Sequence, residues 1–263
     1  MGGQALITDV HTHLGRRSNA SARVDCLLRS MDTARIDTAL VFAGSVSGAR
    51  TNDMLDEIDA HLDRLSGVAA VELSAIAGDI AFGRSVTVDA LSATLRDQRV
   101  VAAKFYLGYE HFDASSNVVR TAMHAVDAAK KTAIFHSGHC HHSAKDARLK
   151  YAHPLSIDDV ATVFPDARIV IAHMGHPWQL DAAAVCHKNA NVFVDVSGFV
   201  YGSFDGTTTR RFRAALEEFS ELPDRILFGS DWPVSDQSSY VDVCNNVFDW
   251  GVIGQNTSRA YTL

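Results

Sequence analysis

The hydrophobic and polar positions of this chain follow two alternating patterns. Segments with an apolar residue every three or four positions predict amphipathic helices, and the short, almost wholly apolar runs between them predict strands buried on both faces of a sheet. The predicted strands are 6–13, 38–43, 67–73, 100–106, 133–136, 168–173, 191–197 and 225–231. Because eight such strands alternate with helices, the pattern favours an α/β fold with a parallel sheet.

The predicted helices lie between these strands, and three of them carry signals for their first residues. Asn117 is expected to cap one helix, Ser156 and Asp159 resemble a capping box ahead of a helix that ends near Pro165, and Pro177 fits the first turn of a helix that continues to about residue 188. The other apolar stripes are those of residues 21–35; of Leu55, Ile58, Leu62 and Leu65; of Val88, Leu91 and Leu95; and of Phe212, Leu216 and Phe219.

The number of strands favours a closed (β/α)8 TIM barrel over an open doubly wound sheet. The 263 residues are enough for such a barrel, which typically takes about 250. The chain shows no linker and no low-complexity segment, so we expect a single domain over residues 1–263.

Composition limits the class of partner. The formal net charge of −7 argues against nucleic acid, which requires a basic face, and we expect a small-molecule substrate instead. No run of about 18 apolar residues predicts a membrane span. We expect no signal peptide, and four scattered cysteines without a CxxC pair fit a cytoplasmic protein. Barrels often pair through their outer helices, which allows a homo-oligomer.

Ionisable and hydroxyl residues stand at the carboxyl ends of five or more of the predicted strands, which is where barrel enzymes build their active sites. They are His11, His13, Lys104, Tyr106, His136, His173, Asp195, Ser197 and Asp231. His11 and His13 are two residues apart, so on a strand both rings face one side and can bind one metal ion. The plainer alternatives are ordinary hydrogen bonds for the histidines and a helix cap for Asp231. Repetition on so many strands favours the metal site.

Five ordered motifs, taken together, resemble the amidohydrolase superfamily, specifically its amidohydrolase-related (amidohydrolase 2) group of barrel metal-dependent hydrolases. The motifs are DVHTH at 9–13, AKFYLGYEHF at 103–112, FHSG at 135–138, IAHMG at 171–175 and FGSDWP at 228–233. The resemblance implies that His11, His13, His136 and Asp231 hold the metal. It also implies that His173 is either a ligand of a second metal or a catalytic group beside a single one.

The resemblance allows two roles for Lys104. In two-metal relatives a lysine on the fourth strand is carboxylated and bridges the ions, whereas a single-metal enzyme could use Lys104 to hold a substrate anion. We favour one divalent metal, with zinc the first expectation and manganese the alternative. Leu107 stands where many relatives have proline, which bears on loop shape. Asp195 and Ser197 are expected to orient a metal ligand.

The long connection 138–155 is expected to be functional, because structureless loops of this length are uncommon in compact domains. Its cluster His139, Cys140, His141 and His142 could be a second metal site, but adjacent loop residues point in different directions, so we expect it to line the mouth of the pocket. The substrate wall is expected to include Tyr106, His153 and Trp178, with Tyr109, Tyr151 and Tyr201 as further candidates and Lys150 as a carboxylate contact.

Three functions remain open at this point. The first is hydrolysis of a small carbonyl-containing substrate (a lactone, ester or amide) by metal-activated water, with Asp231 and His173 as catalytic residues. The second is non-oxidative decarboxylation of a small carboxylic acid, since the same group includes metal-dependent decarboxylases. The third is a non-catalytic barrel that keeps the metal for structure. No expected ligand is missing from the sequence, which favours the first two.

Overall fold

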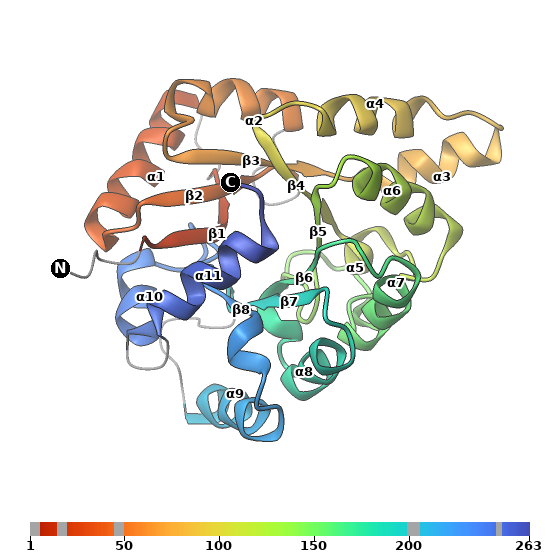
Figure 1. Cartoon of the computed structure of the whole chain (residues 1–263). Helices are drawn as coiled ribbons and strands as arrows, with labels where there is room; N and C mark the ends of the chain where they lie inside the picture. The colour runs from red at the N-terminus through yellow and green to blue at the C-terminus, as the bar shows by residue number, and fades with distance from the viewer. Residues whose placement is uncertain (1–5, 15–19, 45–49, 199–205, 246–248) are drawn as a thin grey trace.

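The strands form one parallel sheet in sequence order, and helices surround it (Figure 1). The computed structural model describes residues 6–14, 20–44, 50–198, 206–245 and 249–263. The strands are β1 Thr8–His13, β2 Thr38–Phe42, β3 Leu65–Ala70, β4 Val100–Phe105, β5 Thr132–Phe135, β6 Ile169–Ile171, β7 Val192–Asp195 and β8 Ile226–Leu227. The described strands all pair with their neighbours in parallel, as the apolar runs predicted.

The sheet closes on itself where the segment after β8 meets β1. Val10 N donates to Phe228 O over 2.9 Å, Asp231 N donates to His11 O over 2.8 Å, and His13 N donates to Trp232 O over 2.7 Å. These bonds join the two edges that an open sheet would leave free. The closed TIM barrel is therefore confirmed, and the open doubly wound alternative is excluded.

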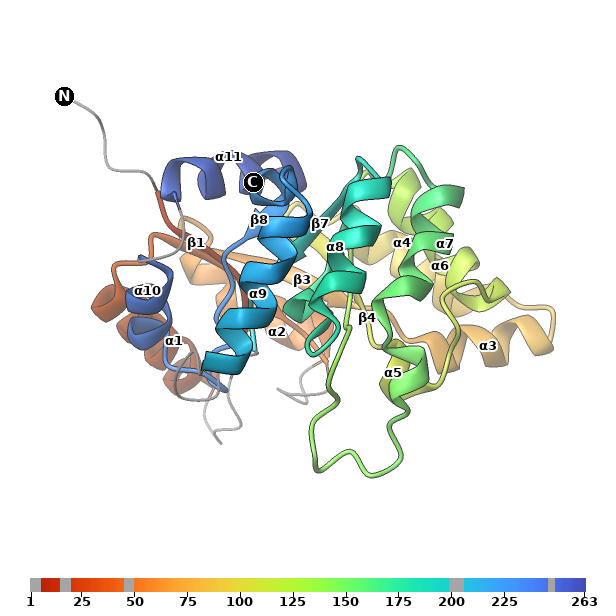
Figure 2. The same ribbon diagram turned by 90° about the horizontal axis from the view of Figure 1, so that it is seen from below.

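The described helices cover the outside of the barrel. They are α1 Ala20–Ala34, α2 Thr51–Ile58, α3 Leu73–Ala81, α4 Val86–Leu95, α5 Leu107–Glu110, α6 Asn117–Ala128, α7 Ile157–Val163, α8 Gln179–Lys188, α9 Gly206–Glu218, α10 Gln237–Cys244 and α11 Trp250–Ala260. Figure 2 shows the long connection after β5 as a green loop that projects beyond α5. Among the described residues, no helix combines the length and the apolar character that crossing a bilayer requires.

Strand alternation separates two apolar cores. Ala103 and Phe105 of β4 belong to the cluster between sheet and helices, whereas Ala102 belongs to the cluster inside the barrel. The chain after α11 fills the amino-terminal end of the interior, where Tyr261 is buried and Thr132 Oγ1 donates to Ala260 O. Lys104 shares the inward face of Ala102 but lies one pleat closer to the carboxyl end. The interior of the barrel is thus apolar towards the amino-terminal ends of the strands and polar towards their carboxyl ends.

Two predicted boundaries were wrong because one apolar run spans two elements. Helix α2 ends at Ile58, so Leu62 is 45% exposed and Leu65 begins β3 instead of completing the helical stripe. Strand β3 ends at Ala70, and Leu73, which was assigned to that strand, begins α3. Helix α3 was not predicted.

Of the three predicted helix starts, the one at Ser156 was correct, because α7 begins directly after it at Ile157, whereas the other two were displaced. The cap of α6 is Ser116, whose hydroxyl accepts from Val119 N, and not Asn117. Ser156 forms no capping box, because its hydroxyl donates to His153 O over 2.8 Å. Pro177 precedes α8, which begins at Gln179. Short polar residues close to a helix start compete for the capping position, and the sequence alone does not order them.

Candidate metal centre

His11, His13 and Asp231 converge at the carboxyl end of the barrel. Both rings project inward from β1 and are nearly fully buried. Asp231 Oδ1 lies 3.3 Å from His13 Nε2 and 3.8 Å from His11 Nε2. Among the described residues, these three form one of two groups whose candidate ligand atoms all lie within 4.8 Å of one another. Two imidazole nitrogens and a carboxylate oxygen are ligands that suit zinc or manganese.

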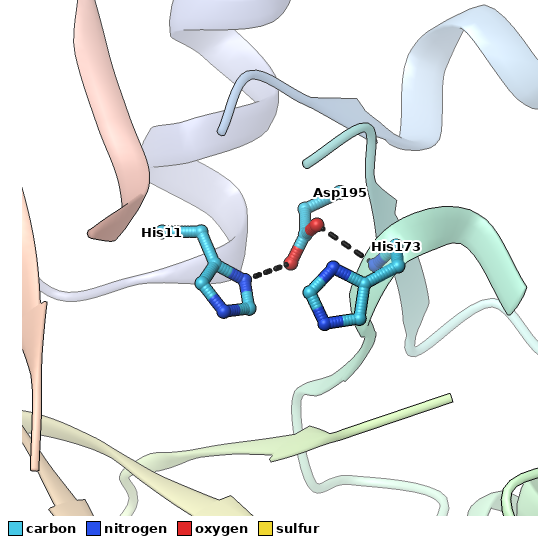
Figure 3. Close-up of side chains that lie close together, drawn as sticks. All are labelled: His11, His173 and Asp195. Carbon is cyan, nitrogen blue, oxygen red and sulfur yellow. Dashed lines mark hydrogen bonds and ion pairs between the residues drawn. The ribbon is translucent and has the colours of Figure 1, made fainter. Parts of the chain in front are cut away.

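The second group consists of His11, His173 and Asp195 (Figure 3). His11 Nδ1 donates to Asp195 Oδ2 over 3.0 Å, and His173 N donates to Asp195 Oδ1 over 2.9 Å. A carboxylate only accepts hydrogen bonds, so the proton of neutral His11 is on Nδ1 and its Nε2 lone pair faces Asp231. A metal-binding histidine needs this tautomer, so Asp195 is placed to orient His11, as predicted.

The charges of the site follow from burial and from the neighbours of each group. Burial, with a contribution from Lys104, lowers the pKa of His11 to about 3, so His11 is neutral at pH 7. Burial alone would raise the pKa of Asp231, but the hydrogen bond from His13 and the nearby His11 and His173 outweigh it and hold that pKa well below its usual range. Asp195 is likewise held below its usual range by His11, against the effect of burial. Neutral imidazoles and ionised carboxylates are the protonation states that bind a cation.

His136 lies beside this cluster and contacts His173. Its Nε2 donates to His139 O over 3.0 Å, and its Nδ1 lies 3.2 Å from His173 Nε2. Since the carbonyl of His139 can only accept, the proton of neutral His136 is on Nε2. The structure brings together three of the four predicted ligands, and His136, which contacts His173, lines the same cavity.

Lys104 reaches the same cavity from β4. Its side chain is fully buried, and Nζ has no hydrogen-bond partner among the described residues. The ammonium lies 5.1 Å from the centre of the Phe42 ring and 5.6 Å from that of Tyr106. Burial lowers the pKa of Lys104 to about 8, against the opposing effect of Asp195 and Asp231. The lysine is thus mostly charged at neutral pH.

Asp9 supports the site and was missed by the sequence reasoning. Its carboxylate accepts from Ser230 N over 3.0 Å, from Ser230 Oγ over 2.6 Å and from Gln237 Nε2 over 2.8 Å. These bonds fix the residue before Asp231 against β1, which also carries the two histidines. The available signal was a carboxylate two positions before His11 in a strand that is buried from Asp9 onward.

The cluster opens into a cavity with about 660 Å³ of empty space, its open mouth included. This size fits a small ligand. The lining residues are His11, His13, Lys104, Tyr106, Tyr109, His136, His139, Cys140, His141, His173, His176, Gly198, Asp231 and Val234. Most of the 139–142 cluster therefore lines the mouth, as expected. His176 was missed, because it lies five residues beyond the end of β6.

Other predicted wall residues lie elsewhere. The rings of His153 and Trp178 contact each other, with centroids 4.6 Å apart, but neither residue lines the cavity. His153 Nε2 lies 3.5 Å from Asp181, and His153 caps a short 3-10 helix at 154–156. Lys150 stacks on the Tyr151 ring outside the cavity. Tyr201 lies outside the described residues.

The fold and this cluster define the chain as a TIM-barrel protein with a candidate divalent-metal site. The family model described as amidohydrolase matches residues 9–252. The chain therefore belongs to the amidohydrolase family, as the motifs indicated. No curated protein matches it.

Solved structures of the same fold cover nearly the whole chain at low identity. One is a probable 2-pyrone-4,6-dicarboxylic acid hydrolase from Acinetobacter baumannii with bound citric acid (18% identity, TM-score 0.68, covering 97% of this chain and 98% of that one). Another is the 5-carboxyvanillate decarboxylase of Sphingomonas paucimobilis (12%, 0.67, 98% and 99%). A third is an amidohydrolase from Burkholderia multivorans with bound zinc (17%, 0.66, 97% and 99%). At these identities the likeness shows the shared fold.

Proposed function

We propose that this protein is a metal-dependent hydrolase of a small carbonyl-containing substrate such as a lactone, ester or amide. The observation that carries the proposal is the convergence of His11 Nε2, His13 Nε2 and Asp231 Oδ1 at the base of a cavity large enough for a small substrate. The amidohydrolase of the same fold that was solved with bound zinc supports the binding of a divalent ion by this protein. When bound, such an ion would polarise the carbonyl and lower the pKa of a water molecule.

Asp231 is proposed as the ligand that also accepts a proton from the attacking water. Its side chain is 14% exposed and faces the cavity, whereas that of Asp195 is 1% exposed. Because its pKa is held low, Asp231 is ionised at pH 7 and able to accept a proton.

His173 is proposed to stabilise the negative charge that develops on the carbonyl oxygen. It lines the cavity next to His11, with ring centroids 4.8 Å apart. Its backbone N–H donates to Asp195, which fixes its position, and burial lowers its pKa.

Decarboxylation is the second candidate, and the likeness to the 5-carboxyvanillate decarboxylase favours it. In that reaction the site would hold the substrate's carboxylic acid, and Asp231 or His173 would protonate the carbon that loses carbon dioxide. The compact length of the chain, without large insertions, favours hydrolysis.

The test is an activity screen of the zinc- or manganese-loaded protein against lactones, esters, amides and aromatic carboxylic acids. We expect acid release from one of the first three, and a loss of about 100- to 10,000-fold in kcat/KM in Asp231→Asn. Asp166→Asn, a change of an exposed aspartate, is the matched control and should leave kcat/KM unchanged. Release of carbon dioxide without hydrolysis would replace the first candidate by the second. Full activity in Asp231→Asn would contradict the assigned role.

A further inference from the structure

Lys104 is a buried cation that faces the cavity without a hydrogen-bond partner among the described residues, although Asp195 and Asp231 are close enough to raise its pKa. The side chain is fully buried, and no oxygen of the described residues accepts a hydrogen bond from Nζ. Nζ lies 5.1 Å from the centre of the Phe42 ring and 5.6 Å from that of the Tyr106 ring. Buried charges are normally paired, because transfer of an ion from water into the protein is costly. The group that completes the pairing has to come from the cavity.

The aromatic contacts explain how an unpaired ammonium is held in place. The negative faces of aromatic rings attract a cation within about 6 Å, and here two rings flank one nitrogen. Phe42 is itself fixed by stacking on His11 at 4.2 Å, and the Tyr106 hydroxyl donates to Ala43 O over 3.1 Å. The cation is therefore held in a position set by the barrel strands.

The charges around the cavity also favour an anionic ligand. Lys104 carries one positive charge, and Asp195 and Asp231 carry one negative charge each. His11, His136 and His173 are neutral at pH 7, because burial lowers the pKa of each. Addition of a divalent ion leaves one net positive charge among these groups. A bound monoanion neutralises it.

We propose that Lys104 binds a carboxylate of the substrate, so that the substrate is a small carboxylic acid that also carries the bond to be cleaved. The identity of that bond rests on the proposed hydrolase function, whereas the carboxylate contact does not. An ammonium–carboxylate hydrogen bond in a buried site is strong and short. Lys104 would then contribute to the choice and orientation of the substrate.

The test measures binding rather than turnover. Glutarate is titrated calorimetrically into the zinc-supplemented wild type, into Lys104→Met and into Lys150→Met, the last being a lysine outside the cavity. We expect glutarate to bind about 10- to 100-fold more weakly to Lys104→Met, which corresponds to loss of a charged hydrogen bond. Lys150→Met should match the wild type. Dimethyl glutarate, which is neutral, should show no dependence on Lys104.

Measurements on the same samples keep the outcomes distinct. Zinc content and the thermal midpoint of Lys104→Met are compared with the wild type, so that a folding or metal defect is recognised. If Lys104→Met does not fold, the wild type alone tests the proposal. Tighter binding of glutarate than of dimethyl glutarate would support a carboxylate site, and equal binding of the two would contradict it. Equal binding of glutarate by the wild type and a folded Lys104→Met, or no binding by the wild type, would overturn the proposal. If the hydrolysis screen fails but glutarate binding depends on Lys104, the proposed hydrolase function is rejected and the proposed carboxylate contact stands.

Carboxylation of Lys104 would also overturn the proposal. In that reaction the amine nitrogen forms a bond to the carbon of carbon dioxide and releases a proton, which leaves an anionic carbamate. An anion at this position would repel a substrate carboxylate. A carbon-13 signal from the wild type in labelled bicarbonate that is absent from Lys104→Met would identify the carbamate. We expect no such signal.

Discussion

Two carboxylates lie next to His11, and their surroundings give them different roles. Asp195 is fully buried and accepts from His11 Nδ1, His173 N and Ser197 N. Protein donors occupy the lone pairs of Asp195, so this carboxylate orients the His11 ring through Nδ1, the nitrogen that faces away from Asp231. Asp231 faces the cavity on the other side of the same ring. The first carboxylate therefore sets the geometry, and the second is available to an ion.

Replacement of Asp195 by asparagine should weaken metal binding. The amide nitrogen cannot accept the His11 Nδ1 proton, so the proton moves to Nε2, the atom that faces Asp231. We expect metal affinity to fall by about 10- to 100-fold, measured by competition with a chromogenic chelator. Asp181→Asn is the control, because this half-exposed carboxylate contacts His153 outside the cavity. Wild-type affinity in Asp195→Asn would show that Asp195 does not orient His11.

At the scale of elements, the loops after the strands determine how the site residues meet. Gly138 follows β5 at a φ of +92°, and an added Cβ would lie 2.2 Å from His176 O. The backbone of Gly138 also donates to Ala152 O, and that of His139 donates to His176 O. This glycine thus brings the chain after β5 into contact with the chain after β6. Both segments contribute histidines to the mouth of the cavity.

Gly138→Ala should destabilise the protein, because alanine is strained at this φ and the Cβ collides with a carbonyl. We expect a loss of about 2 kcal/mol or more in the free energy of unfolding, measured by urea denaturation. Gly78→Ala is the matched control. Gly78 lies in α3 with nothing within 4 Å of an added Cβ, so alanine should stabilise by up to about 1 kcal/mol. A Gly138→Ala variant as stable as the wild type would contradict the close contact between Gly138 and the carbonyl of His176.

Periodicity predicted the elements well where each has its own apolar run, and poorly where runs merge. The inward and outward alternation of a strand such as β4 is a local property, so the direction of Lys104 could be read from Ala102 and Ala103. Helix α3 was missed because apolar residues continue beyond the end of β3 as far as Ile76, with Glu72 and Ser74 as the polar interruptions. The position of His136 against His173 was not predictable either. It depends on side-chain rotations and on the carbonyl of His139, which lies in a loop.

At the scale of the whole molecule, the candidate metal ligands lie on both sides of the seam that closes the barrel. His11 and His13 belong to β1, and Asp231 follows β8, which is only two residues long. The motifs predicted that these residues meet, since they occur at the first and last strands of an eight-stranded barrel. The Asp9 contacts to Ser230 and Gln237 that hold the seam involve residues more than 200 positions apart, and no local pattern signals them.

The metal content of the purified protein tests most directly whether His11, His13 and Asp231 form a divalent-metal site. Elemental analysis is made on the wild type, on His11→Asn/His13→Asn and on His124→Asn/His187→Asn, a control that changes two exposed histidines away from the cavity. We expect about one equivalent of zinc or manganese per chain in the wild type and in the control, and its loss in His11→Asn/His13→Asn. Wild-type protein that takes up no divalent ion, or full occupancy in His11→Asn/His13→Asn, would contradict this expectation.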